Sequence, residues 1–564
     1  MKKIHSLILV ISILFSTKVF CQDLFLKVKG DSEAETLIID SINYNKTHKD
    51  YTSLKLEVNT IQKKLYKLGF IENEFEEIKK LNDSIFISKV KLKRKFNTIF
   101  IYYKKELIDK LNLKLISNNI YRDYIKIEFT QIENTLSYIN SKITEKGFPF
   151  SKLRLSNIRI KDDSNLEADL YVESSSEKRT ISDIVIKGYE KFPKAYLKYF
   201  LKIKPTQDFD LKKIRTKTEQ LNNLNFANEI KPPEVLFLKD STTLYLYLEK
   251  TRSNAFDGFL GFGTNEETNK LEFDGYLNLN LTNNLNFGES FRLLYKSDEN
   301  DQKTFETDIS LPYLLKSPIG LDLLLRIFKK DSTFTTINQF AKLHYQLNAL
   351  NKVYAGISAT ESNNLLNSGS NLPIEDYNSE YFTLAYQFSN PQPYSLLFPI
   401  NSKLYFETNF GNRKTISNKE KQSLLSIDAF KIFNLNQKNS IYIRGNGSKL
   451  ISNTYFENEL LRFGGINSIR GFEENSIFST LFGLINTEYR LQINNSIYIH
   501  SIIDAAYFEN KILSIKEKLF GYGFGFGILT KSGLLRFNYA NGKLENQKFN
   551  LSNSKIHLSL TTQF

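Results

Sequence analysis

Residues 555–564, KIHLSLTTQF, end the chain with apolar and polar side chains in alternation. This period of two predicts a β-strand with one apolar and one polar face. Because chain ends usually fray in water, such a terminal strand is more typical of a transmembrane β-barrel, whose last strand pairs with its first. A soluble β-sandwich is the alternative for this strand taken alone.

The first 21 residues have the pattern of a secretory signal. Lys2 and Lys3 begin it, an apolar run follows at 7–15, and cleavage is expected after Cys21. Lipid attachment at Cys21 is the alternative, which the large Phe20 beside it disfavours. Removal of Cys21 leaves a mature chain without cysteine, so neither disulfides nor thiol chemistry are expected to be structural.

The composition narrows the class of protein further. The chain has 76 Lys and Arg, 62 Asp and Glu, 45 Phe, 31 Tyr and no Trp. Its charges are interleaved, so an anionic membrane surface is a better partner than nucleic acid. No apolar run of about 18 residues follows residue 21, which excludes a helical membrane protein. An aromatic-rich, secreted chain of this kind is typical of an outer-membrane barrel.

Up to residue 250 the pattern is mixed α+β, and it repeats at about 75 residues as three modules in β-α-α-β-β order. In the third module we expect strands at 181–188, 234–238 and 242–250, and helices at 192–201 and 210–224 with Asp210 as the cap. In the second we expect strands at 98–103, 153–160 and 166–172, and helices at 106–115 and 127–146. In the first, weaker module we expect strands at 24–29 and 84–93, and two helices ending near 68–70.

From Asn254 onward the period becomes two, and roughly sixteen strand-like segments follow. An even number suits a closed antiparallel barrel with both ends on one side of the membrane. The sequence thus predicts α+β periplasmic repeats followed by a 16-stranded antiparallel transmembrane barrel. The expected divisions are a signal peptide (1–21), three modules (22–95, 96–175 and 178–250) and the barrel (254–564).

The longest gap between predicted strands, 453–478, separates the eleventh from the twelfth and contains RFGGINSIRGF at 462–472. Further motifs follow in order: NTEYR at 486–490, IDAA at 503–506, and SGLLRFNYA at 532–540. Together they resemble the BamA/TamA superfamily of outer-membrane assembly barrels, whose inward-folding loop carries an aliphatic residue before Arg-Gly-Phe. One departure is Asn401-Ser402, where the family pattern has a Gly after a proline.

The resemblance implies that the three modules are POTRA domains in the periplasm and that the barrel lies in the outer membrane. It implies an assembly or translocation factor that captures clients by strand augmentation and releases them through a laterally gated barrel. The partners would be unfolded outer-membrane or secreted client proteins, outer-membrane lipids, and periplasmic chaperones or accessory lipoproteins. The alternative is a two-partner secretion pore for one exoprotein, a class that usually has two POTRA domains and a plug helix.

The resemblance places the loop motif at Gly464, Gly465, Ile469, Arg470, Gly471 and Phe472. An arginine inside a barrel needs carboxylate partners, because an unpaired desolvated charge is costly. Glu488 and Asp504 lie on adjacent predicted strands with the same polar parity, so we expect both to face the lumen near Arg470. The alternative is that Arg470 is a solvated loop residue and the two acids line a wet pore.

Four alternate glycines, Gly521, Gly523, Gly525 and Gly527, lie on one face of a predicted strand. We expect them to make room for the inserted loop; the alternative is that they bend the strand at a barrel corner. In the last strand, Leu558, Leu560 and Phe564 are expected to form a terminal assembly signal.

Enzymatic chemistry is not expected. The chain has five histidines, a single cysteine and no Gly-x-Ser-x-Gly motif, which leaves few residues for catalytic or metal chemistry. We therefore expect no catalytic residue, metal or cofactor.

Overall fold

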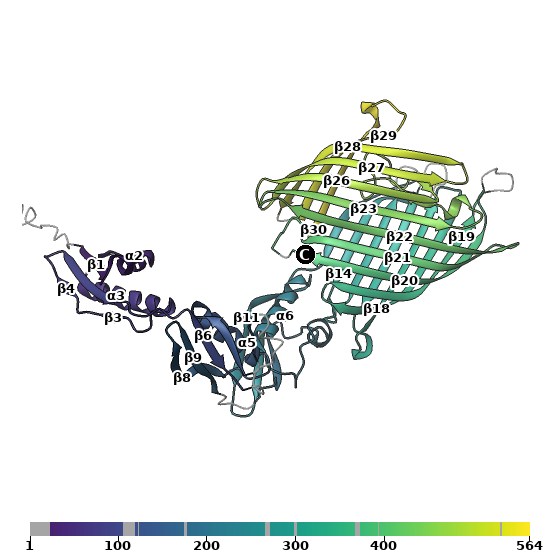
Figure 1. The fold of residues 1–564 in the computed structure, drawn as a ribbon. Coiled ribbons are helices and arrows are strands. Elements are labelled where there is room, and N and C mark those ends of the chain that lie inside the picture. Colours follow the sequence, from purple (N-terminus) through teal and green to yellow (C-terminus); the bar gives the residue numbers. More distant parts are fainter. Residues whose placement is uncertain are drawn as a thin grey trace, which may run out of the picture. The chain divides into compact units, whose positions relative to one another are not determined.

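The computed structural model describes residues 23–104, 119–121, 123–173, 178–264, 271–297, 302–366, 373–392, 394–530 and 533–563. The signal peptide, the helix expected at 106–115 and Phe564 lie outside these residues. The chain divides into two compact units (Figure 1). One comprises residues 1–180 with 208–211, and the other comprises 181–207 with 212–564.

The first α/β module contains the two strands and two helices expected from its sequence, together with three short strands that were not predicted. Its elements are β1 (Leu24–Gly30), α2 (Glu33–Ser41), β2 (Thr47–His48), α3 (Tyr51–Lys67), β3 (Glu74–Phe75), β4 (Lys79–Lys80) and β5 (Ile85–Lys91). The sheet order is β2-β1-β5-β3, with β1 and β5 parallel. Asp50 caps α3 by accepting from the Ser53 amide at 2.7 Å. The buried Leu54, Val58, Ile61 and Leu65 follow the helical period and pack in the module's core.

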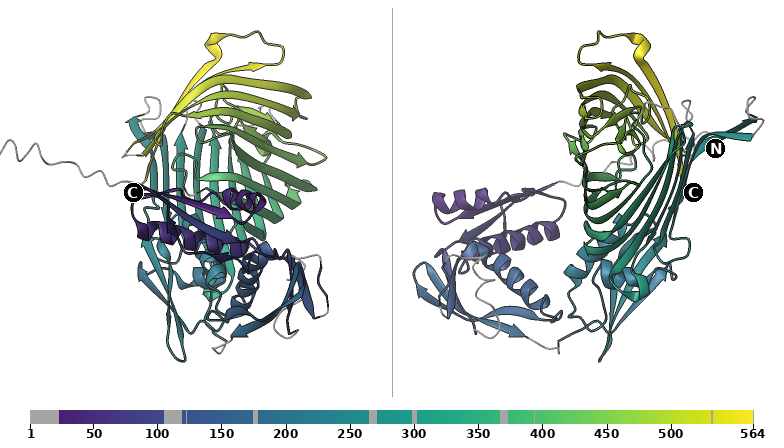
Figure 2. Two further views of the ribbon diagram at one scale, coloured as in Figure 1. Left: turned by 60° about the vertical axis from the view of Figure 1, so that its left-hand side comes forward. Right: turned by 90° about the vertical axis from the view of Figure 1, so that its right-hand side faces the viewer.

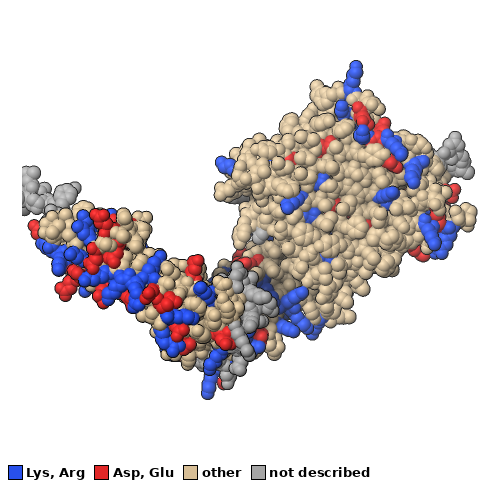
Figure 3. Space-filling model, in the orientation of Figure 1, with Lys and Arg blue, Asp and Glu red and all other residues tan. Residues whose placement is uncertain are grey.

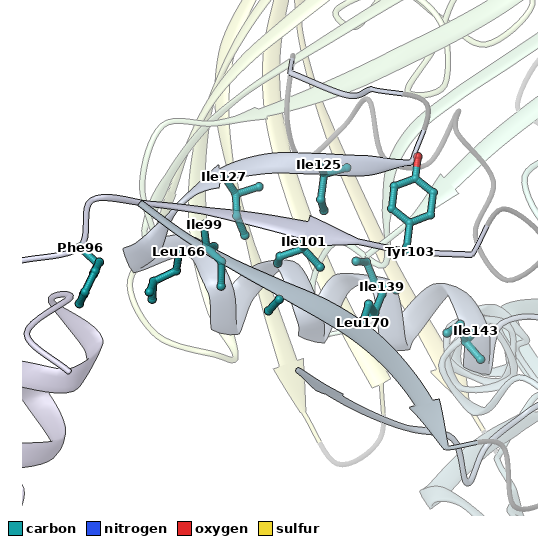
Figure 4. Packing of buried hydrophobic residues seen from close by; sticks show 11 residues of the cluster. Phe96, Ile99, Ile101, Tyr103, Ile125, Ile127, Ile139, Ile143, Leu166 and Leu170 are labelled. Carbon is teal, nitrogen blue, oxygen red and sulfur yellow. The ribbon is translucent and has the colours of Figure 1, made fainter. Parts of the chain in front are cut away.

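The second module contains one strand that the sequence interpretation missed. Its elements are β6 (Thr98–Tyr102), β7 (Tyr124–Glu128), the 3₁₀ turn η1 (Phe129–Gln131), α5 (Ile132–Thr144), β8 (Lys152–Asp162) and β9 (Asn165–Glu173), in sheet order β7-β6-β9-β8. The helix predicted from 127 begins instead at Ile132. Ile125 and Ile127 alternate into the core as β7 pairs with β6, so the strand period prevails there (Figure 4).

The third module lies in the same compact unit as the barrel. It comprises β10 (Asp183–Gly188), the π-helical turn η2 (Tyr196–Phe200), α6 (Leu211–Thr218), the 3₁₀ turn η3 (Glu219–Asn223), β11 (Ala227–Phe237) and β12 (Thr242–Lys250), with sheet order β10-β12-β11. The predicted strand 242–250 is confirmed. The strand predicted from 234 begins earlier, at Ala227, and contains Pro232 and Pro233, which an edge strand tolerates.

The prediction of a 16-stranded antiparallel barrel is confirmed. The strands are β13 (Ala255–Thr264), β14 (Leu271–Thr282), β15 (Ser290–Ser297), β16 (Gln302–Leu311), β17 (Ile319–Lys330), β18 (Phe334–Asn348), β19 (Asn351–Asn364), β20 (Tyr377–Pro391), β21 (Ile400–Lys414), β22 (Lys419–Asn434), β23 (Asn439–Ile451), β26 (Leu481–Gln492), β27 (Ile497–Asn510), β28 (Ile515–Thr530), β29 (Gly533–Leu544) and β30 (Ser554–Gln563). Each pairs with its neighbours in antiparallel register, and β30 returns to β13.

The barrel wall is amphipathic because its strands alternate. In β27, Ile499 and Ile503 point outward and are exposed, whereas His500 and Asp504 point inward and are buried. Figure 3 shows that the visible outer face of the barrel carries few charged side chains between its two rims. An apolar outer face and a polar lumen are the arrangement that a transmembrane barrel requires.

Candidate functional site

A long loop, residues 452–480, joins the eleventh barrel strand to the twelfth, as the gap in the sequence pattern predicted. Two short strands inside it, β24 (Leu461–Phe463) and β25 (Ile477–Ser479), pair as a hairpin. We call 452–459 the base segment and 464–476 the tip segment. The tip segment contacts the inward-facing side chains of the barrel wall, so the loop folds into the lumen.

Arg470 of the tip segment is held by two carboxylates of the wall. Its Nε donates to Asp504 Oδ2 at 2.8 Å, and its Nη2 donates to Asp504 Oδ1 at 2.6 Å, which makes a bidentate pair. Its backbone amide also donates to Asp504 Oδ2, and its Nη1 donates to Glu488. All three residues are less than a tenth exposed. The structure therefore brings Arg470 of the loop together with the two carboxylates that strand parity placed on one face.

A second arginine balances the charge of this cluster. Arg490, two residues along β26 from Glu488, donates from Nε to Glu488 Oε2 at 2.8 Å. Two guanidinium groups thus face two carboxylates, so the buried cluster has no net charge. Neutrality matters here because an uncompensated charge in a poorly solvated site is costly.

The residues beside Arg470 fix the tip by packing. Ile469 is fully buried in an apolar cluster inside the lumen, and Phe472 packs against its edge. The barrel contributes Phe482, Leu484, Ala506, Phe508 and Leu519 to this cluster. The loop therefore packs against an apolar patch on an otherwise polar inner wall.

The glycines separate into two groups. A Cβ on Gly521 would lie 2.4 Å from the carbonyl oxygen of Arg470, so this glycine leaves room for the loop. The expectation is wrong for the other three. A Cβ on Gly523, Gly525 or Gly527 would first meet atoms of the barrel itself. Gly525 and Gly527 leave room for lumen-facing rings, those of His500 and Tyr498, respectively.

Sequence reasoning missed Gly542, on β29. Gly471 has φ +90°, and its backbone lies so close to β29 that a Cβ on either Gly471 or Gly542 would approach the other's backbone to 2.4 Å. Gly542 is also the strand partner of Gly521. The Asn-Gly pair at 541–542 resembles an ordinary turn signal, which gave no reason to single it out.

Gly464 and Gly465, the other predicted glycines of the tip, both have positive φ. The Gly464 amide donates to Ser468 Oγ at 3.1 Å, which closes a tight turn before Arg470. Beyond Arg470, two tip carboxylates pair with lysines of the wall. Glu473 lies 2.9 Å from Lys555 of β30, and Glu474 lies 3.6 Å from Lys296 of β15.

The seam between the first and last strands is the weakest in the barrel. Among the described residues, β13 and β30 pair at only two positions, Ala255 with Gln563 and Phe256 with Thr562. Every other neighbouring pair of barrel strands matches at eight or more positions. Figure 2 shows the C-terminal end of the chain against the teal first strands.

The predicted terminal signal is described only in part. Leu558 is 69% exposed on the outer face of β30, as a membrane-facing residue should be. The side chain of Leu560 and the whole of Phe564 lie outside the described residues, so the role of this terminus stays a prediction. Over the part of the chain that is described, there is no group of three metal-ligating side chains, and no helix is long and apolar enough to span a membrane.

The comparisons with known proteins agree with this architecture. The family model described as "Surface antigen variable number repeat", POTRA, matches residues 179–249, which form the third module. No curated protein matched the chain. Of the solved structures, CdiB from Acinetobacter baumannii is 16% identical with a TM-score of 0.53, over 83% of this chain and 90% of that chain.

CdiB from Escherichia coli is 12% identical with a TM-score of 0.52, over 83% of this chain and 90% of that chain. BamA from Haemophilus ducreyi lacking POTRA domains 1–3 is 14% identical with a TM-score of 0.48, over 82% of this chain and 99% of that chain. The POTRA match identifies the third module, and the CdiB structures share the fold of this chain, so a POTRA domain followed by a 16-stranded barrel is confirmed. This architecture fits an outer-membrane protein whose N-terminal part lies in the periplasm.

Proposed function

We propose that this chain assembles proteins into the outer membrane by opening its barrel between β13 and β30. The observation that carries the proposal is the two-position seam. Ordinary barrels close every strand edge, because an unpaired backbone group in lipid is costly. A seam with few hydrogen bonds opens at a lower cost than any other, and its free edges offer a client strand somewhere to pair.

Client capture is proposed at the exposed edges of the N-terminal sheets. In the second module, the edge strand β8 presents Ile158 and Ile160, which are 55% and 50% exposed. In the third module, the edge strand β11 presents Ile230 at 55% exposure. An edge strand with exposed apolar side chains can accept an extended client strand by β-augmentation. Periplasmic chaperones or accessory lipoproteins would deliver clients to these edges.

The second candidate is a secretion pore that passes one exoprotein through the lumen. Two observations favour it: the fold shared with CdiB, and a lumen cavity of about 460 Å³ beside the inserted loop. Polar residues such as Asn338, Tyr381 and Gln422 line this cavity. A pore would need the loop to leave the lumen, but it would not need the seam to open.

A disulfide across the seam distinguishes the two functions. The test pair is Phe256→Cys with Thr562→Cys in a chain whose Cys21 is replaced, because these positions are partners in the β13–β30 register. The control pair, Tyr539→Cys with Ile556→Cys, joins β29 to β30 away from the seam. We expect oxidation of the test pair, but not of the control pair, to stop client assembly, and we expect reductant to restore it.

The readout is outer-membrane proteomics in cells that depend on the variant. Broad loss of barrel proteins on oxidation supports an insertase with a lateral seam. Unchanged barrel proteins would contradict it, and continued export of a single secreted protein through the locked barrel would support the pore.

A further inference from the structure

Another arginine is buried where the loop leaves the barrel wall. Arg413, on β21, is 2% exposed and lies between Glu420 of β22 and Glu459 of the base segment. Its Nη2 donates to Glu420 Oε2 at 2.6 Å, and its Nη1 donates to Glu459. The side chains of both acids are 6% exposed or less. One wall arginine therefore joins a wall carboxylate to a loop carboxylate.

Further hydrogen bonds to the two carboxylates cross the same junction: Glu420 of the wall binds the base segment, and Glu459 of the base segment binds the wall. Glu420 accepts from the Thr454 amide at 2.9 Å, from Thr454 Oγ1 at 2.6 Å, from Ser452 Oγ at 3.0 Å and from the Asn453 amide. Glu459 accepts from Gln422 Nε2 at 2.9 Å. These bonds stabilise the second negative charge, which a single guanidinium does not neutralise.

Arg413 makes further contacts with the base segment. Its guanidinium lies 4.0 Å from the ring centre of Phe456, and its Nη2 donates to Thr454 Oγ1 at 2.6 Å. All of its loop contacts fall within 452–459. The base is thus tied to β21 and β22, on a different part of the wall from the strands that hold Arg470.

The two networks differ in which part of the protein supplies the arginine. At the tip, the loop supplies the arginine, and β26 and β27 supply the carboxylates. At the base, the wall supplies the arginine and the loop supplies one carboxylate. The networks share no residue, and β24 lies between them in the chain. Loss of one network therefore removes no direct contact of the other.

We propose that Arg413, Glu420 and Glu459 form a base anchor that positions the loop independently of the tip anchor, Arg470, Glu488 and Asp504. The tip segment can then leave its carboxylates while the base segment stays attached, so the loop moves as a hinged arm rather than leaving the lumen. The use of this movement during client release rests on the proposed function. The independence of the two anchors does not.

Spin labels on the purified full-length protein test this independence. With Cys21 replaced, Asn453→Cys reports on the base and Ser476→Cys reports on the tip, since both positions are exposed. We expect Arg413→Gln to shift the label at 453 from the immobilised to the mobile component and to leave the label at 476 unchanged. Arg470→Gln should do the reverse.

Matched variants control for general loosening of the barrel. Arg292→Gln removes an ion pair between β15 and β16 that does not touch the loop, so neither label should respond. The exchange Arg413→Glu with Glu459→Arg keeps one guanidinium between two carboxylates and should return the label at 453 to the immobilised state. Rescue by this exchange would show that the charges position the base segment, because the exchange keeps the ion pairing and changes the shapes of both side chains.

Glu459→Gln is the milder variant in case Arg413→Gln does not fold, because Arg413 then keeps Glu420. It should mobilise the label at 453 with the same selectivity. The proposal is overturned if loss of either anchor mobilises both labels equally. It is also overturned if the spectrum of the label at 453 does not change in Arg413→Gln and Glu459→Gln. The spectra do not depend on clients, so a failed client-assembly assay would count against the proposed function and not against the two anchors.

Discussion

At the scale of single residues, the tip anchor is a buried charge cluster. The free-energy cost of removing its charges from water is offset because every charge has an opposite partner. Arg470 and Arg490 face Glu488 and Asp504, and the side chain of Asp504 is only 1% exposed. Removal of one member leaves a partner charge poorly solvated. That loss typically costs about 3–5 kcal/mol when burial is complete, and less where lumen water reaches the site.

Arg470→Ala should therefore free the tip segment. We expect new protease cleavage within 464–476, mapped by mass spectrometry, while the barrel still migrates as a folded, heat-modifiable band. Arg470→Lys should rescue poorly, because an ammonium cannot replace the bidentate fork to Asp504. The exchange Arg470→Asp with Asp504→Arg tests the pairing itself. Wild-type proteolysis and client assembly in Arg470→Ala would show that the contact has no role.

Gly521→Ala should also displace the tip, for a steric reason. The new Cβ would lie 2.4 Å from the backbone oxygen of Arg470, and overpacking of this kind typically costs about 1–3 kcal/mol. Gly483→Ala is the matched control, because a Cβ there meets nothing within 4 Å. We expect a lower unfolding temperature and a protease-sensitive tip only for Gly521→Ala. Equal behaviour of the two variants would contradict the close approach.

The sequence predicted part of the site because successive side chains of a barrel strand alternate between the lumen and the outer face. Glu488 and Asp504 had to face the lumen once their strands were assigned. Arg413 and Glu459 were missed because their contact joins a strand to a loop 46 positions later, and no period connects them. Gly542 was missed because its small size matters only against the folded loop.

At the scale of elements, tyrosines dock the third module on turns at one end of the barrel. Tyr189 Oη donates to Asn286 Oδ1 at 2.7 Å and accepts from Asn283 Nδ2 at 2.8 Å. Tyr196 Oη donates to the Gly288 carbonyl at 3.2 Å, and burial raises the pKa of Tyr196 so that it stays a neutral donor. The module is therefore held to the turn between β14 and β15.

Tyr189→Phe should loosen this docking, because it removes two hydrogen bonds that contribute about 1 kcal/mol each. Gly288→Ala should loosen it more, since a Cβ there would meet the Tyr196 ring at 2.2 Å. Hydrogen exchange at residues 283–289 and in β10 is the measurement, with faster exchange expected in both variants. Tyr247→Phe, on the exposed face of β12, is the control. Unchanged exchange in Gly288→Ala would exclude a fixed contact.

Elements were predictable where one period dominated. The alternation in 242–250 gave the bounds of β12, and the barrel strands followed from the same signal. The failure at 127–146 has a local cause. Residues 124–128 alternate as a strand does, and the helical period begins only three residues later, after η1. No Gly or Pro stands between the strand and the helix, so the sequence does not mark the boundary.

At the scale of the whole molecule, composition and alternation together determine the barrel. Its outer face exposes Ile357, Phe382 and Phe410 at 66%, 51% and 50%, an apolar surface that only lipid can cover at low cost. This outer face fits a barrel that lies in a membrane. The third module belongs to the same compact unit, whereas the first two modules form a separate unit.

This division predicts the outcome of a deletion. A chain that keeps residues 1–22 and lacks 23–173 retains β10–β12, the tyrosine contacts and all sixteen barrel strands. We expect it to reach the outer membrane and to show heat-modifiable migration like the full chain, because its internal contacts are intact. Client assembly should fall, since the exposed edge of β8 is lost and only the edge of β11 remains.

The decisive comparison is the same deletion combined with Gly288→Ala. If β11 captures clients from a fixed position against the barrel, the second change should remove the residual assembly without lowering the amount of folded barrel. Undiminished client assembly after the deletion alone would contradict capture by β8. A deleted chain that never reaches the membrane would instead show that the first two modules are needed to fold the barrel, contrary to the separation of the two units.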